Sequence, residues 1–287
     1  MFGPNQITKY SHKMKYSHRT EKFKSLYKKC TQKIIDKFSL QDYDLIFVPG
    51  SGTTGMETVI SSLKTKVNVI GPDGKFKQRW LKYCENNERY DRESEVDLYC
   101  QLETSTGEVF CSGTGIVDAI SSFPYYDIPK GTKCFVTCSN KQLGGFPGLS
   151  LVFVKKDSWD LFEGKEYFCT KDLLLYKKMQ ENNQTPTTCP VQIFKQLVLI
   201  MDKFDLQQHR QRIDRVCNMF SQIIEPDNQI PCPVINIPKS QISKFVASKY
   251  ELYNHNNEKD IYQIFSYSNK FKKYKKLYKD IVNEKSN

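Results

Sequence analysis

Short apolar runs alternate with segments of helical periodicity through most of the chain. Residues 44–48 are typical of a buried strand, and Met56, Val59, Ile60 and Leu63 follow at helical spacing. Further runs predict strands over residues 66–70, 96–102, 115–117, 133–138 and 149–154. Strands that are bounded by glycine and alternate with helices favour an α/β domain with a largely parallel sheet.

After Pro190 the pattern changes. Residues 191–204 and 206–224 predict consecutive helices, and the strand-like segments that follow are 231–238, 250–253 and 261–267. The last segment predicts an amphipathic helix with Phe271, Tyr274, Tyr278 and Ile281 on one face and lysines mostly elsewhere. We therefore expect three parts: an N-terminal segment (1–24) joining the small domain and the active site, a large α/β domain (25–205) and a small C-terminal α+β domain (206–287).

The composition is that of a folded protein. Hydrophobic residues make up 39% of the 287 residues and aromatic residues 13%, which excludes global disorder. No apolar run approaches the roughly 20 residues that span a bilayer, and the mean hydropathy is −0.58. The N-terminus lacks a charged head followed by an apolar block, so we expect no signal peptide and a cytoplasmic protein.

Charge and cysteine content add little to the prediction of partners and metal sites. The net charge of +11 permits binding of nucleic acid or of anionic metabolites, and lysines of the last helix form its densest cluster. The ten cysteines are scattered without a C-x-x-C pair, and the four histidines supply no second ligand pair. We therefore expect buried free thiols and no metal site; nucleic acid stays an open partner.

One glycine-rich turn joins the first strand to its helix. Its sequence is Pro49-Gly-Ser-Gly-Thr-Thr-Gly55, which places hydroxyls and free amides at a helix N-terminus. It lacks the P-loop lysine and is not G-x-G-x-x-G, so nucleotide binding is disfavoured. The turn predicts a phosphate cradle.

Two charged residues end neighbouring strands. Asp118 follows the apolar residues 115–117, and Lys141 comes just after residues 133–138. Ligands bind at the carboxyl ends of parallel strands, and a lysine desolvated there has the reactive neutral amine favoured. Thr104 to Thr106 add hydroxyls at a third strand end. A phosphate cradle, an aspartate and a lysine in this order are the parts of a pyridoxal phosphate (PLP) site.

These motifs resemble the class V aminotransferases of fold type I, nearest the 2-aminoethylphosphonate–pyruvate and alanine–glyoxylate transaminases. The resemblance runs through Gly3-Pro4, Ser17-His-Arg19, Gly50-Ser-Gly-Thr53, Gly74-Lys-Phe76, Glu103-Thr-Ser-Thr-Gly107, Asp118-Ala-Ile120, Ser139-Asn-Lys141 and Thr185-Pro-Thr-Thr188. It implies a mainly parallel, seven-stranded-type sheet flanked by helices, a homodimer, and transfer of an amino group from an amino acid or aminophosphonate-like donor to a 2-oxo acid such as pyruvate or glyoxylate.

The resemblance also implies residue roles. Lys141 is the catalytic lysine that forms the cofactor aldimine, and Asp118 is the partner of the pyridine nitrogen. The other cofactor contacts are Ser51, Gly52 and Thr53 at the phosphate, Asn140 before the lysine, Phe76 stacked on the ring, Thr104 at the ring hydroxyl, Ile120 beneath the ring, and Thr188 at the phosphate of a neighbouring subunit.

Two departures from the family pattern bear on the substrate. Gln101 stands where many relatives have histidine, and Gln263 stands where the family places an arginine that binds a substrate carboxylate. Arg19 and Arg79 are the candidates to replace that arginine, and a structural ion pair is the alternative for each. A PLP-dependent lyase, a decarboxylase, or a transaminase for an unusual amine therefore stays open, as does a degenerate, non-catalytic basic binding protein.

Overall fold

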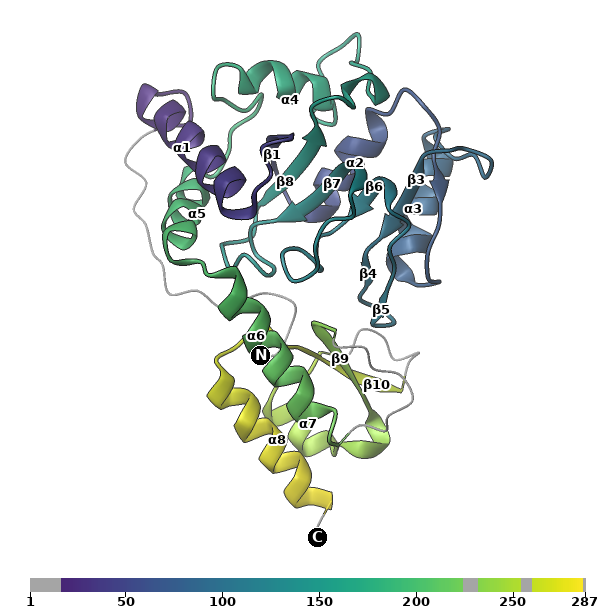
Figure 1. Cartoon of the computed structure of the whole chain (residues 1–287), viewed down its shortest axis with the longest axis vertical. Helices are drawn as coiled ribbons and strands as arrows, with labels where there is room; N and C mark the ends of the chain where they lie inside the picture. The colour runs from purple at the N-terminus through teal and green to yellow at the C-terminus, as the bar shows by residue number, and fades with distance from the viewer. Residues whose placement is uncertain (1–16, 224–231, 254–259, 286–287) are drawn as a thin grey trace.

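A six-stranded sheet forms the centre of the larger of two lobes in the computed structural model, which describes residues 17–223, 232–253 and 260–285 (Figure 1). Its strands are β1 (Tyr43–Pro49), β2 (Asn68–Val69), β3 (Asp97–Cys100), β6 (Thr114–Asp118), β7 (Gly131–Cys138) and β8 (Leu149–Lys155). Their order is β1-β8-β7-β6-β3-β2, and only β8 runs against its neighbours. The mainly parallel α/β fold is confirmed, with six strands in the described residues where the resemblance implies a seven-stranded type.

Helices cover both faces of this sheet. The covering helices are α1 (Glu21–Phe38), α2 (Gly52–Ser61), α3 (Lys75–Asn86), α4 (Leu173–Gln180) and α5 (Val191–Lys203). Leu45 and Phe47 of β1 pack with α1 and α5, whereas Ile46 and Val48 pack with α2 and α3. Successive side chains of a strand point to opposite faces, so a strand covered on both faces is apolar at every position.

The smaller lobe follows α5. It contains α6 (Leu206–Phe220), β9 (Val234–Pro238), α7 (Lys244–Lys249), β10 (Ile261–Phe265) and α8 (Phe271–Lys285), with α6 extending from one lobe into the other (Figure 1). The predicted terminal helix is confirmed, because Tyr274 and Ile281 are buried in this core and its lysines face outward. The strand predicted over residues 250–253 is wrong: a turn leads to Tyr253, which alone bridges to Gln263.

The predicted domain boundaries stay predictions, but the N-terminal segment has a definite place where it is described. Residues 1–16, with Gly3 and Pro4, lie outside the described residues. Phe23 at the start of α1 is buried in the larger core, with its ring 5.1 Å from that of Phe194. Residues 17–24 therefore begin the cover of the larger sheet.

A short hairpin of the larger lobe contacts the smaller one. It consists of β4 (Leu102–Glu103) and β5 (Glu108–Val109) and lies beside β9 and β10 (Figure 1). Asn236 donates its amide N–H to the Thr106 carbonyl oxygen at 2.7 Å, and Gln263 donates to that of Thr104 at 2.6 Å. These bonds link the two lobes through backbone acceptors.

The described residues contain no helix long and apolar enough to cross a membrane, and no cluster of three or more histidine, cysteine or acidic side chains suited to a metal ion. Eight of the ten cysteines are buried, with Cys111 exposed and Cys169 intermediate.

A buried carboxylate caps α3. The helix has no side-chain cap of its own at Gly74, but Glu103 Oε2 accepts from the amides of Phe76 and Lys77, each at 3.0 Å. Its Oε1 accepts from the Ser105 amide at 3.1 Å. A Cβ on Gly74 would overlap the Glu103 side chain, so the close approach requires glycine. The hairpin thus fixes the first turn of α3.

We predict that Glu103→Ala lowers the free energy of unfolding by about 1–3 kcal/mol, because three amides, that of Ser105 buried and two partly buried, lose a charged acceptor. Denaturant unfolding of the purified protein measures it. Glu108→Ala on the exposed side of the same hairpin is the control and should change stability by no more than about 0.5 kcal/mol. Equal effects for the two variants would contradict the capping role.

Candidate active site

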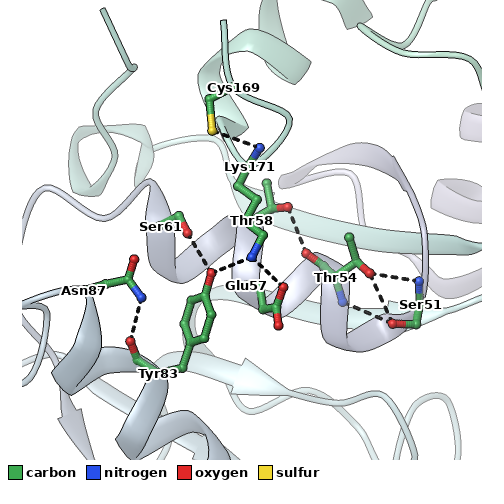
Figure 2. Close-up of polar contacts among 9 residues, drawn as sticks. All are labelled: Ser51, Thr54, Glu57, Thr58, Ser61, Tyr83, Asn87, Cys169 and Lys171. Atoms are coloured by element: carbon green, nitrogen blue, oxygen red, sulfur yellow. Dashed lines mark hydrogen bonds and ion pairs between the residues drawn. The ribbon is translucent and has the colours of Figure 1, made fainter. Parts of the chain in front are cut away.

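The first turn of α2 presents free amides at the carboxyl edge of the sheet. Ser51 is the N-cap: its Oγ accepts from the Thr54 amide at 3.3 Å, and Thr54 Oγ1 accepts from the Ser51 amide at 3.2 Å (Figure 2). This capping box leaves the amides of Gly52 and Thr53 among the N–H groups that no helical bond uses. Helix N-termini attract anions, so this turn fits a phosphate.

Gly52 lies in close contact with the segment that follows β6. A Cβ at this position would lie 2.7 Å from Ile120 Cγ1, closer than side chains pack. Gly50 before it has φ +138°, a conformation that favours glycine. The glycines are therefore required by geometry, and they bring the cradle beside Ile120.

A polar cluster ties α2 to α3. The Lys171 ammonium lies 2.8 Å from Glu57 Oε2 of α2 and donates to the Tyr83 hydroxyl of α3 at 3.0 Å (Figure 2). That hydroxyl lies 3.1 Å from Ser61 Oγ, again on α2. Each contact is partly exposed and individually weak. Together they hold the cradle helix and the helix that carries Phe76 in a fixed relation.

Asp118 ends β6 and is 6% exposed. Its Oδ1 accepts from the Ile120 amide at 3.0 Å, and its Oδ2 accepts from the Trp80 indole N–H at 2.8 Å and lies 3.7 Å from Cys100 Sγ. Burial raises the pKa of this carboxyl to about 6, and the charge of Glu103 adds to the rise, while the bonds from Ile120 and Trp80 oppose it. The site therefore holds a carboxylate that can bind a cationic ring N–H.

Lys141 follows β7 at the same edge. Burial lowers the pKa of its ammonium group, and electrostatic interactions with Cys138 and Asp118 act in the opposite direction. Within the described residues its Nζ has no hydrogen-bond or ion-pair partner. A lysine with a lowered pKa has more neutral amine at a given pH, as a nucleophilic lysine requires.

Phe76 and Arg79 line the approach to the cradle. Phe76 is half-buried in the first turn of α3, and the Arg79 guanidinium carbon lies 4.9 Å from the centre of its ring. Arg79 is exposed and donates to Thr53 Oγ1 at 3.4 Å. Of the two arginines predicted as substitutes, Arg79 is thus the one that contacts α2.

Arg19 is engaged elsewhere. Its guanidinium donates to the Thr185 carbonyl at 3.2 Å, the Pro186 carbonyl at 3.1 Å and Gln184 Oε1 at 3.3 Å. It anchors the loop leading to Thr188, which is exposed. The contact of Thr188 with a neighbouring subunit stays a prediction. Asn140 precedes Lys141, and Thr104 follows β4 in the hairpin; their contacts with a cofactor stay predictions.

Gln101 and Gln263 are both fully buried and bonded to protein. Gln101 Nε2 donates to the Asp127 carbonyl at 2.7 Å, and its Oε1 accepts from Ser122 Oγ at 2.6 Å. Gln263 Nε2 donates to the Thr104 carbonyl at 2.6 Å and to Asn236 Oδ1 at 2.9 Å. Both N–H groups of Gln263 are therefore occupied, unlike those of an arginine that binds a substrate.

Sequence reasoning missed Trp80 and the capping role of Glu103. One signal for Trp80 was its spacing of four from Phe76, which puts the two rings on one face of α3. The signal for Glu103 was a carboxylate in an apolar strand, because a buried charge requires partners.

The fold is that of the fold type I aminotransferases. The solved aspartate aminotransferase of subgroup IV from Thermus thermophilus superposes with a TM-score of 0.84 and 15% identity over 99% of this chain and 98% of that one. The alanine–glyoxylate aminotransferase from Nostoc sp. superposes with a TM-score of 0.78 and 16% identity, over 98% of this chain and 93% of that one.

The similarity inferred from the motifs is confirmed in sequence too. The 2-aminoethylphosphonate–pyruvate transaminase of Cupriavidus necator is 26% identical over 195 residues, 54% of this chain and 52% of that protein. The chain thus spans about half the length of the curated relatives it matches. No family model matches the chain.

We predict that Lys141 is acetylated by acetic anhydride at lower pH than the exposed lysines of α8. Its pKa is lowered, so neutral amine persists as the pH falls below the range where ordinary lysines are protonated. Mass spectrometry of peptides over a pH series measures this. In Asp118→Asn the reactivity should extend to still lower pH, since the anion that stabilises the ammonium is gone. A profile for Lys141 identical to that of Lys276 would contradict the prediction.

Proposed function

We propose that this chain is a class V, PLP-dependent aminotransferase, acting in a reducing compartment such as the cytoplasm, where its buried thiols stay free. The observation that carries the proposal is the meeting of three groups at one sheet edge: the α2 amides, the buried Asp118 and Lys141. The names and folds of the relatives support the same class.

The residues present fit the cofactor. Gly52 lies so close to Ile120 that a Cβ would overlap its side chain, and the free amides of this turn suit a phosphate. Asp118 suits a protonated ring nitrogen, Phe76 a stacked ring, and Lys141 an aldehyde carbon. When bound, PLP supplies an electron sink that stabilises negative charge at the donor carbon.

Each residue then has a defined task. Lys141 would hold the cofactor through Nζ, and its amine would move a proton at the donor carbon as base and acid. Asp118 holds a proton at the ring nitrogen, because its carboxylate stabilises the charged ring. The amides of Gly52 and Thr53 hold the phosphate, and Phe76 keeps the ring in place. Thr104, Ile120 and Asn140 complete the proposed contacts.

The substrates follow from the charges near the site. We propose an amino acid or aminophosphonate-like donor and a 2-oxo acid acceptor such as pyruvate or glyoxylate. Since Gln263 has no free N–H, a donor's α-carboxylate lacks a bidentate partner there. Arg79, exposed beside Thr53 and Phe76, is the cation placed to receive an anion farther from the amine.

The buried Gln263 also favours a second candidate, a PLP-dependent lyase or decarboxylase. In that case the same Lys141 and Asp118 would act, but the donor would lose a carbon group instead of passing on its amine. Formation of the pyridoxamine form of the cofactor separates the two, because only transamination leaves the nitrogen on it.

Donor half-reactions test the function. We predict that an aminophosphonate or ω-amino donor converts the bound cofactor, seen as loss of the band near roughly 410–430 nm, about ten- to a hundredfold faster than alanine or serine. This factor corresponds to one missing charged hydrogen bond of about 1.5–3 kcal/mol. Lys141→Ala should show neither band nor conversion, and Asp118→Asn should keep the band and lose much of the rate.

Arg79→Ala should raise the KM for the phosphonate donor about tenfold or more, with Arg92→Ala, another exposed arginine, as the control. Full activity of Lys141→Ala would end the proposal. Alanine or serine as the best donor would overturn the substrate assignment while the cofactor assignment survives.

We also propose a homodimer in which Thr188 reaches the phosphate bound by a neighbouring subunit. The exposed position of Thr188, on a loop anchored by Arg19, supports this. Thr188→Val should weaken PLP binding about tenfold, for one lost bond to a charged group, without changing the dimer. Light scattering and cofactor titration at several protein concentrations measure both. A monomer that holds the cofactor tightly would contradict it.

A further inference from the structure

We propose that Trp80 is a positioning residue for the cofactor: its indole N–H orients the Asp118 carboxylate and keeps it ionised for the ring nitrogen. The inference rests on the proposed PLP function and adds a residue for which no role was expected from the sequence.

The geometry of the contact is specific. Trp80 is fully buried, and its Nε1 lies 2.8 Å from Asp118 Oδ2. The Ile120 amide occupies Oδ1 at 3.0 Å. Since an indole nitrogen can only donate, this bond requires a lone pair on Oδ2 and opposes protonation of that oxygen. The two donors fix the plane of the carboxylate as well as its charge.

The indole is itself held in place. Trp80 lies one helical turn after Phe76 on α3, so the same helix face delivers the ring proposed to stack on the cofactor and the donor to Asp118. Glu103 caps the first turn of this helix, and Tyr83 ties its second half to α2 through Lys171. A shift of α3 would move both rings together.

The surroundings explain why such a donor is needed. Burial and the Glu103 charge favour the protonated carboxyl, whereas the Cys100 thiol, which donates to Oδ2 at 3.7 Å, acts in the same direction as the indole. Lys141 and Cys138 face the same region from the end of β7. A carboxyl that kept its proton would leave the ring nitrogen neutral and the electron sink weaker. The indole shifts this balance towards the carboxylate.

The chain contains its own matched control. Its only other tryptophan, Trp159, donates Nε1 to Asp44 Oδ2, also at 2.8 Å. Asp44 is at the start of β1 and is given no part in the site. The two residues therefore make the same indole–carboxylate bond, and only that of Trp80 belongs to the proposed site.

The first test uses ¹⁵N-labelled protein and its two indole N–H signals, assigned with Trp159→Phe. We expect the Trp80 signal to move between pH 5 and 7 as Asp118 titrates, to lose that titration in Asp118→Asn, and to shift when PLP is added. The Trp159 signal should do none of these. A Trp80 signal that ignores both Asp118→Asn and PLP would overturn the inference without requiring any Trp80 variant.

The second test compares Trp80→Phe with Trp159→Phe. We expect Trp80→Phe to raise the dissociation constant for PLP about ten- to a hundredfold, the effect of one charged hydrogen bond, and Trp159→Phe to change it less than about threefold. The pH below which PLP binding weakens should also rise in Trp80→Phe, because the Asp118 carboxyl without its indole donor stays protonated up to a higher pH. If Trp80 were merely structural, its replacement would lower the affinity for PLP without changing that pH.

The outcomes separate the inference from the function on which it rests. If the unaltered protein binds no PLP, the proposed function fails. If it binds PLP, and Trp80→Phe matches Trp159→Phe in dissociation constant and pH profile, the positioning role fails alone. In protein that already carries Asp118→Asn, Trp80→Phe should weaken PLP binding much less than it does in the unaltered protein. Fully additive effects of the two substitutions would count against an action of Trp80 through Asp118.

Discussion

The rest of the site depends on the burial of one carboxylate and on the donors that this burial requires. Asp118 lies at the end of a central parallel strand, where a charge is costly unless donors surround it. Its donors come from three places: the loop after β6, the strand β3 and the helix α3. The same α3 is capped by Glu103 and linked to α2 through Lys171. The positions of the Asp118 carboxylate, the α2 cradle and the Phe76 ring therefore depend on one another.

Much of this was accessible from the sequence, for physical reasons. The apolar β1, β7 and β8 are covered on both faces, so their runs predict a buried sheet, in which β8 alone is antiparallel. The groups that follow β1, β6 and β7 lie at one edge because these strands run in the same direction. What the sequence concealed depends on long-range contacts. The Trp80–Asp118 bond joins residues 38 positions apart, and residues 250–253 have strand-like composition but form a turn.

Gln263 is a buried amide whose hydrogen bonds join the two lobes. With Asn236 it donates to the β4–β5 hairpin, and the carbonyl oxygens of Thr104 and Thr106 fix the orientation of both amides. The position is thus occupied in joining the lobes, and in the proposed reaction Arg79 beside α2 would bind the anion. The fold supports the cofactor site more strongly than it defines the donor.

The role of Lys141 is tested most simply by locating the bound cofactor chemically. The protein loaded with PLP is reduced with borohydride, which fixes the cofactor to its lysine, and is then digested and mapped by mass spectrometry. We expect one modification per chain on the peptide containing Lys141, absent in Lys141→Ala. Modification of another lysine, or labelling spread over several lysines of the basic surface, would contradict it.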